Sequence, residues 1–272
     1  MTGAAHRMAP ERHPEFVEAL AKGLAILEAF DPAHPDMTLS EVARRVGLTP
    51  AAARRSLITL TELGYVGSRD KRFHLKPRIM ALGSAFYYAA RFDELVQPDL
   101  RNLVARFGDA SSVSTLDGAE VIYVAHVSVQ RARRAAAVIG ARYPAHATSM
   151  GRVLLAALPP PELDALLACT ALTALTSRTC TDPCELRAEL GRVREQGYAT
   201  TVDQLDYGIT ALAVPIRDAE GRTIAALNTS GYTGMVTPEH LVAERLPALR
   251  EAASHIAHEI GRFPVLQSML GS

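Results

Sequence analysis

The chain has 272 residues, 48% hydrophobic and 21% charged, and its 29 basic residues balance 29 acidic ones. This composition fits a folded protein of two domains and excludes a disordered or fibrous chain. No run of about eighteen apolar residues occurs, so we expect no membrane span. Residues 1–13 lack the apolar stretch of a secretory signal, and we expect a disordered tail there.

The three cysteines, Cys169, Cys180 and Cys184, are odd in number, and their spacing fits neither a disulfide framework nor a zinc site. We interpret them as ordinary thiols of a reduced, cytoplasmic protein. We expect no metal and no cofactor.

Two helices are predicted at the start of a first domain, residues 14–76. Phe16–Phe30 carries apolar side chains at helical spacing. Thr38 with Glu41 three residues later forms a capping box, which begins a second helix. Gly47 is the residue type that ends such a helix in the left-handed conformation.

A third helix begins at Thr49, the N-cap, with Pro50 in its first turn. Two short helices joined by a tight turn aim the second of them into a DNA major groove. Residues 65–66 and 73–75 then read as strands around a basic turn. The segment therefore predicts a winged helix–turn–helix.

The charge pattern points to the same segment. Residues 40–80 contain nine basic and three acidic residues in a chain that is neutral overall. A basic run is most often plain solvated surface, but a basic patch on a DNA-reading motif is typical of nucleic-acid binding. The predicted DNA-binding residues are Thr38, Ser40, Thr49, Ala51, Ala52, Arg54, Arg55, Thr59, Arg69, Lys71 and Arg72.

Residues 77–93 predict a linker helix that opens at Pro77. It has too many apolar positions for an isolated helix in water, so we expect it to pack against a partner helix or the next domain and to act as a dimerisation element.

Residues 94–264 predict an α+β domain, with an antiparallel sheet made from hairpins and covered by helices. Turn residues, caps and apolar periodicity give its elements. In chain order they are strands 111–116, 120–127 and 135–139, helices 149–158 and 182–196, strands 209–216 and 223–230, and one final helix over 237–261.

Several stretches resemble the IclR family of bacterial transcriptional regulators, and most of all its regulators of protocatechuate, 4-hydroxybenzoate and β-ketoadipate breakdown. They are 47–66, 147–156, 202–204, 212–216 and 225–228. The resemblance implies a winged-helix head, a dimerising linker helix and a GAF-like domain that binds a small organic acid, aromatic or dicarboxylic. It also implies action as a homodimer or dimer of dimers on double-stranded operator DNA, controlling catabolic genes.

An effector site is predicted where Thr148 and Ser149 begin a helix, because free N–H groups at a helix N-terminus hold a carboxylate. Asn228 and Ser230 share one strand face, and Tyr123 and His126 are expected on a facing strand that closes the pocket. Plain capping at Thr148 and a satisfied strand end at Asn228 are the alternatives. The predicted effector residues, several of them by match to the family, are Tyr123, His126, Thr148, Ser149, Met150, Gly151, Thr201, Asp203, Ala211, Asn228 and Ser230.

Three other functions stay open at this stage. An enzyme acting on a small carboxylic acid has candidate groups in His126, His146, Asp203 and the three cysteines, but no nucleophile–base motif accompanies them. A nonspecific architectural DNA-binding protein would have no use for the large neutral domain. A regulator that senses a non-aromatic metabolite is favoured by Leu205 and Thr210, which depart from the pattern of the aromatic-acid regulators.

Overall fold

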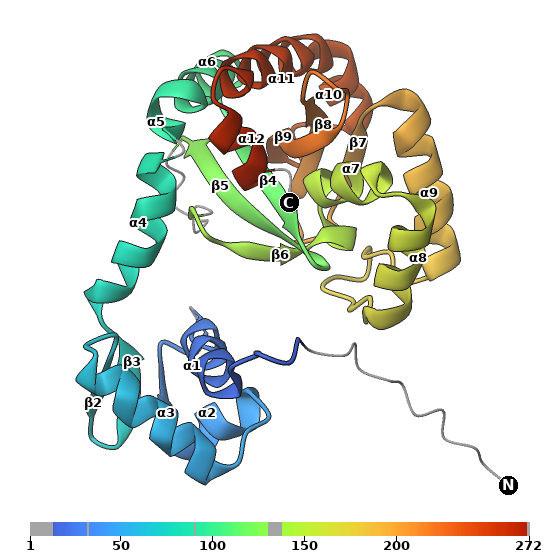
Figure 1. Cartoon of the computed structure of the whole chain (residues 1–272). Coiled ribbons are helices and arrows are strands. Elements are labelled where there is room, and N and C mark those ends of the chain that lie inside the picture. The colour runs from blue at the N-terminus through green and yellow to red at the C-terminus, as the bar shows by residue number, and fades with distance from the viewer. Residues whose placement is uncertain (1–12, 32, 90, 130–137, 271–272) are drawn as a thin grey trace, which may run out of the picture. The chain divides into compact units, whose positions relative to one another are not determined.

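The computed structural model describes residues 13–31, 33–89, 91–129 and 138–270. These form two compact units that divide between Ala85 and Phe86 (Figure 1). The predicted tail lies outside these ranges except for residue 13, and the division into 14–76, 77–93 and 94–264 stays a prediction. No helix in the described ranges is long and apolar enough to cross a bilayer.

The first unit is a three-helix head with a small antiparallel sheet in the order β1-β3-β2. Its core is formed by Ile26, Val42 and Leu57, which are all fully buried. The elements are α1 (Glu18–Glu28), β1 (Asp36–Thr38), α2 (Leu39–Arg45), α3 (Pro50–Glu62), β2 (Val66–Arg69), β3 (Arg72–Leu75) and the 3₁₀ turn η1 (Pro77–Ile79); α4 (Met80–Ala89) follows.

Local hydrogen bonds explain where α2 and α3 begin. The Glu41 amide donates to Thr38 Oγ1 (3.3 Å), and the Thr38 amide donates to the Glu41 carboxylate (2.7 Å), so the predicted capping box is confirmed. Those bonds from Thr38 lower the pKa of the Glu41 carboxyl. Gly47 has φ +66°, as its role at the end of α2 requires. Thr49 Oγ1 accepts from the Ala52 amide at 3.2 Å and begins α3.

The second unit contains one six-stranded antiparallel sheet in the order β6-β5-β4-β9-β8-β7, which confirms the predicted α+β class. Its elements are α5 (Phe92–Leu95), α6 (Gln97–Phe107), β4 (Ala110–Asp117), β5 (Glu120–Ser128), β6 (Arg142–Pro144), η2 (Ala145–Ala147), α7 (Ser149–Ala157), α8 (Pro160–Cys169), α9 (Pro183–Gln196), β7 (Ala199–Val202), β8 (Ile209–Arg217), β9 (Thr223–Tyr232), α10 (Pro238–Glu244), α11 (Leu246–Gly261) and α12 (Pro264–Leu270).

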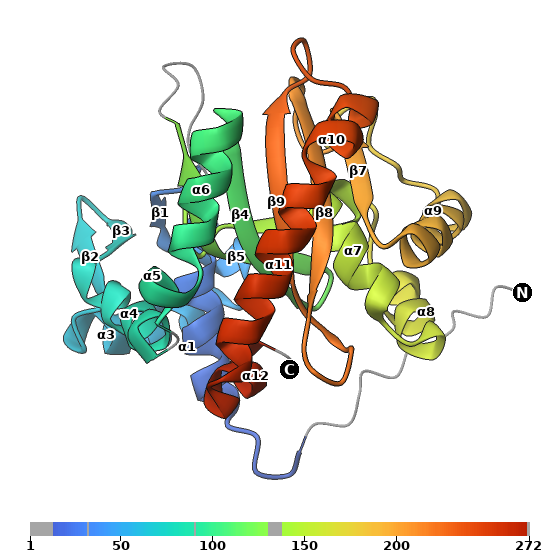
Figure 2. The ribbon, with the colours of Figure 1, turned by 90° about the horizontal axis from the view of Figure 1, so that it is seen from above.

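Helices cover both faces of this sheet. Figure 2 shows α6 and α11 side by side on one face, with α7 on the other. Leu212, Val214 and Leu227 point to the α6–α11 side and belong to the larger core. Ala213 and Ala226, which alternate with them, belong to a second core under α7. The sheet therefore separates two hydrophobic cores, one under α6 and α11 and the other under α7.

A bulge in the β4–β5 pair changes which side chains share a face. Val113 pairs with Ala125 and Ser114 pairs with Tyr123, so Val124 is an extra residue. Val124 and Ala125 both pack in the α6–α11 core, whereas Tyr123 packs under α7. Tyr123 and His126 consequently lie on one side of the sheet although they are three positions apart.

Two predicted elements were wrong. Of the strand predicted over 135–139, residues 135–137 lie outside the described ranges, and the other two belong to no strand. The Ala141 amide donates to the Val138 carbonyl (3.0 Å) in a turn, hydrogen bonds to Tyr123 of β5 begin at Gly140, and the strand itself begins at Arg142. The final helix is interrupted at Arg245, because Pro247 lacks an N–H and its ring clashes with an uninterrupted preceding turn.

Candidate DNA-reading surface and effector site

Helix α3 separates a buried face from a basic exposed face. Ala53, Leu57 and Leu60 pack into the head. Arg54 and Arg55 are exposed, and neither makes an ion pair among the described residues. Of the other predicted contacts on α2 and α3, Ser40, Thr49, Ala51 and Thr59 are exposed and Ala52 is half-buried. The arginine side chains are thus free to reach phosphates or a base edge.

The β2–β3 turn contributes a second basic surface. Asp70 and Lys71 both have positive φ, and Arg69 and Lys71 project from the turn into solvent. Arg72 differs from them, because its guanidinium donates to the Asp36 carboxylate (2.7 Å) and the Asp36 carbonyl (3.1 Å). Arg72, like the capping residue Thr38, therefore has a structural partner within the head.

The start of α7 brings together four of the predicted effector residues. Thr148, Ser149, Met150 and Gly151 are all buried. Thr148 Oγ1 accepts from the Gly151 amide (2.9 Å) and caps the helix. No hydrogen bond within the described chain occupies the amides of Ser149 and Met150, as expected for a helix N-terminus.

A polar row crosses the sheet on the side that α7 covers. The register places Asn228 of β9 beside Ser112 of β4, and Ser112 beside His126 of β5. Asn228 Oδ1 accepts from the Ser112 amide (2.9 Å), and Ser112 Oγ lies 2.9 Å from His126 Nδ1. His126 was expected on a facing strand; instead it lies in the same sheet as Asn228, with β4 between them.

Two atoms on the α7 side are buried without a partner within the described structure, Ser149 Oγ and His126 Nε2. Burial also lowers the pKa of His126, so its imidazole is neutral near pH 7. Buried polar atoms are nearly always hydrogen-bonded in folded proteins. An orphan serine hydroxyl and an orphan imidazole nitrogen in one layer are features of a binding site.

The remaining predicted residues lie either on the α7 side of the sheet or in the loop between β7 and β8. Thr201, Ala211 and Ser230 form a second row in register across β7, β8 and β9. Asp203 is outside it, because its carboxylate accepts from the Gly208 amide (2.7 Å) and from Thr233 Oγ1 (2.8 Å). Its carboxylate thus holds the loop between β7 and β8.

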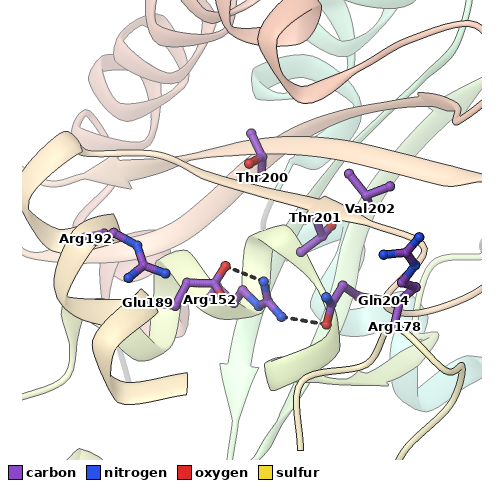
Figure 3. Close-up of a pocket in the computed structure, with 8 residues that line it drawn as sticks. All are labelled: Arg152, Arg178, Glu189, Arg192, Thr200, Thr201, Val202 and Gln204. Atoms are coloured by element: carbon purple, nitrogen blue, oxygen red, sulfur yellow. Dashed lines mark hydrogen bonds and ion pairs between the residues drawn. The ribbon is translucent and has the colours of Figure 1, made fainter. Parts of the chain in front are cut away.

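A hollow of about 530 Å³ lies along β7, the edge strand of the sheet (Figure 3). Arg152 of α7 reaches it and is only 2% exposed. Its guanidinium forms an ion pair with Glu189 and donates to Gln204 Oε1 (2.7 Å) and the His146 carbonyl (2.9 Å). The lining residues are Arg152, Arg178, Glu189, Arg192, Thr200, Thr201, Val202 and Gln204.

Sequence reasoning missed Ser112 and the residues around Arg152. Ser112 stands in the serine-rich start of a strand, Ser111-Ser112-Val113-Ser114, where buried hydroxyls are a usable signal. Arg152 was the single charge in an otherwise apolar helix, which is a signal for a buried ion pair. Nothing local indicated its partners Glu189 and Gln204.

Two family models match the chain. The IclR helix-turn-helix domain matches residues 19–70, and the C-terminal domain of bacterial IclR transcriptional regulators matches residues 90–258. The Pca regulon regulatory protein of Pseudomonas putida is 36% identical over 248 residues, covering 91% of this chain and 85% of that protein. The p-hydroxybenzoate hydroxylase transcriptional activator of Acinetobacter baylyi is 35% identical over 250 residues, covering 90% and 92%.

The fold is also similar to solved structures. An IclR homolog from Microbacterium hydrocarbonoxydans, crystallised in complex with 4-hydroxybenzoate, superimposes with a TM-score of 0.72. It is 27% identical, and the match covers 90% of this chain and 99% of that one.

Proposed function

The chain belongs to the IclR family of bacterial transcriptional regulators, and from that premise we propose that its effector is a small aromatic acid bound between α7 and the sheet. Family membership makes it a DNA-binding transcriptional regulator and sets aside the enzyme and the architectural protein. The observation that carries the effector proposal is the pair of buried, unpartnered polar atoms, Ser149 Oγ and His126 Nε2, on one side of the sheet.

The start of α7 is suited to a carboxylate. The amides of Ser149 and Met150 and the hydroxyl of Ser149 are donors without partners in the described chain. The partial positive charge at a helix N-terminus favours an anion there without any charged side chain. We assign the acid group of the effector to these donors.

His126 is suited to the polar substituent of an aromatic ring. Its neutral imidazole has one nitrogen beside Ser112 and the other free. Tyr123 lies on the same side, with its ring centroid 5.1 Å from that of Tyr143 in an edge-to-face pair, and provides an aromatic wall. The 4-hydroxybenzoate bound by the Microbacterium homolog has both groups that this site would recognise.

Calorimetric titration tests this assignment with 4-hydroxybenzoate, protocatechuate, benzoate, β-ketoadipate, pyruvate and glyoxylate. We expect saturable binding of a hydroxylated aromatic acid and weaker binding of benzoate. Ser149→Asp should abolish binding by repelling the carboxylate, whereas Ser254→Asp, which adds the same charge on the exposed side of α11, should leave it unchanged. Binding that survives Ser149→Asp, or no binding of any aromatic acid, would refute the assignment.

For DNA we propose that residues 14–76 read the operator, that 77–93 dimerise the chain, and that 94–264 hold the effector. The protein would act in the cytoplasm as a homodimer or a dimer of dimers, with effector binding shifting the population of dimer geometries. Arg54 and Arg55 on α3 and Lys71 in the wing are its principal contacts, since all three are exposed and without ion-pair partners in the described chain.

Gel-shift titration with the chain's own promoter region tests the reading face. Arg55→Ala should raise the operator Kd at least tenfold, because a charged contact to phosphate or guanine contributes roughly 1–3 kcal/mol. Arg101→Ala, an exposed arginine of α6, is the matched control and should change nothing. An unchanged Kd for Arg55→Ala would refute the assigned reading face.

A further inference from the structure

The hollow along β7 has an excess of positive charge. Glu189 is the only carboxylate among its lining residues, and the buried Arg152 already holds it in an ion pair. Arg178 and Arg192 are exposed, and neither has an ion-pair partner within the described chain. Two guanidinium groups thus face the hollow without a neutralising charge, which creates a local positive potential.

These two guanidinium groups are well separated. Arg192 comes from α9, whereas Arg178 comes from the segment before that helix. Figure 3 shows them on opposite sides of the Arg152–Glu189 pair. A compact anion at one arginine would leave the other unused, whereas an elongated molecule with an anionic group at each end would engage both.

The edge of β7 supplies further donors. The Asp203 amide donates to the Ile209 carbonyl of β8 (2.8 Å), so alternation directs the amides of Thr201 and Ala199 toward β8 as well. The amides of Thr200 and Val202 therefore point away from the sheet at its open edge. Both residues line the hollow, where their N–H groups are available to carboxylate oxygens.

We infer that this hollow is a second small-molecule site, which binds an aliphatic dicarboxylate with one carboxylate at Arg178 and the other at Arg192. Planar guanidinium groups bind carboxylates through two parallel hydrogen bonds, which suits this ligand class. The site uses neither Ser149 nor His126, so we assign it to a ligand separate from the aromatic acid, although Thr201 of the second row also lines the hollow.

Calorimetry with adipate, hexanoate and inorganic phosphate tests the inference on the full chain. Adipate should bind saturably, and hexanoate at least tenfold more weakly because it has one charge. The double variant Arg178→Ala/Arg192→Ala should raise the adipate Kd at least tenfold. Arg217→Ala, an exposed arginine at the end of β8, and Ser149→Asp should both leave it unchanged. Added salt should weaken binding, since both arginines are exposed.

Four results would overturn the inference. The first is no binding of adipate, and the second is adipate binding to the double arginine variant that is as tight as binding to the wild type. The third is phosphate binding as tight as adipate binding, which would indicate a compact anion site. Loss of adipate binding in Ser149→Asp would show that the hollow and the aromatic-acid site are one. Circular dichroism of the double variant checks that a lost affinity is not lost folding.

Discussion

The two faces of the large sheet are made from alternate residues of the same strands, yet they differ in polarity. On the α6–α11 side, Leu212, Val214 and Leu227 belong to the larger apolar core, and the buried Thr229 and Arg245 beside them are hydrogen-bonded to each other. On the α7 side, Ser112 and Asn228 bring hydrogen-bonding groups into the interior at 3% and 5% exposure. The α6–α11 side mainly stabilises the fold, whereas the α7 side carries the polar groups that we assign to ligand recognition.

The difference shows how a single sheet combines two tasks. Apolar packing contributes stability in proportion to the area removed from water. Buried polar groups contribute little net stability even when bonded, and they destabilise the protein when left without partners. The α7 side combines its own apolar core with the unpartnered Ser149 Oγ and His126 Nε2, which we assign to a ligand.

The largest expected effect comes from opening the apolar face. Leu212 is fully buried, and Leu212→Ala should lower the free energy of unfolding by about 2–5 kcal/mol, from lost burial and the cavity left behind. Urea denaturation measures this change. The effector Kd of the folded variant should stay within twofold of wild type; a tenfold change would contradict the separation of the two faces.

Adding a methyl group at Gly151, in the first turn of α7, should disturb the α7 side of the sheet. A Cβ at position 151 would lie 2.1 Å from the Ala145 carbonyl oxygen, which is backbone and cannot simply rotate away. Gly151→Ala should therefore destabilise the protein by about 3 kcal/mol and abolish effector binding as α7 shifts. Gly191→Ala on α9, where a Cβ meets nothing within 4 Å, is the control.

Asn228→Ala should affect recognition more than stability. The change leaves the buried Ser112 amide without its acceptor, at a cost of about 2 kcal/mol in unfolding free energy. Calorimetry should show effector affinity reduced at least tenfold, because the polar row that orients Ser112 and His126 is broken. Wild-type affinity in this variant would mean that the row is structural only.

His126 should make the protein less stable in acid. Burial lowers the pKa of His126 in the folded protein below the ordinary 6.5. As the pH falls through 6.5, His126 therefore binds a proton in the unfolded chain but not yet in the folded one. Its stabilising contribution is present above pH 6.5 and is lost as the pH falls toward the native pKa. His126→Gln should flatten this part of the stability–pH curve, measured by urea unfolding between pH 5 and pH 8 (a range of roughly three units around the ordinary pKa).

His255 should act in the opposite sense, with the smallest effect. It lies on α11 with Nδ1 2.8 Å from the Asp99 carboxylate, which raises its pKa above 6.5. Its contribution is complete below pH 6.5 and is lost as the pH rises through the native pKa. The ring is largely exposed, so solvent screens the pair. His255→Gln should lose this small dependence while keeping that of His126; a slope of the same sign for both histidines would contradict the assignment.

Elements governed by neighbouring residues were predictable from the sequence. The starts of α2, α3 and α7 each depend on a threonine and an amide three residues later, as at Thr38, Thr49 and Thr148. Local rules failed at prolines, because a proline can follow the end of one helix and also stand in the first turn of the next. Helix α8, which begins at Pro160, was not predicted, and Pro247 was overlooked although it interrupts the last helix.

The candidate site was only partly predictable, because its contacts are distant in sequence. Ser112 and Asn228 are 116 residues apart, and Arg152 and Gln204 are 52 apart. No periodicity or capping rule connects such pairs. The helix N-terminus at Ser149 could be identified from its own segment, whereas the row that faces it required the sheet order.

The bulge in β5 makes the shape of the effector site depend on backbone register as well as on residue type. On a strand without a bulge, side chains three positions apart project to opposite sides of the sheet, so Tyr123 and His126 would not share a face. Moving the bulge along β5 is thus an independent means of remodelling the ligand-facing surface. A designer who wants a new effector specificity can change its position while leaving the strands packed under α11 untouched.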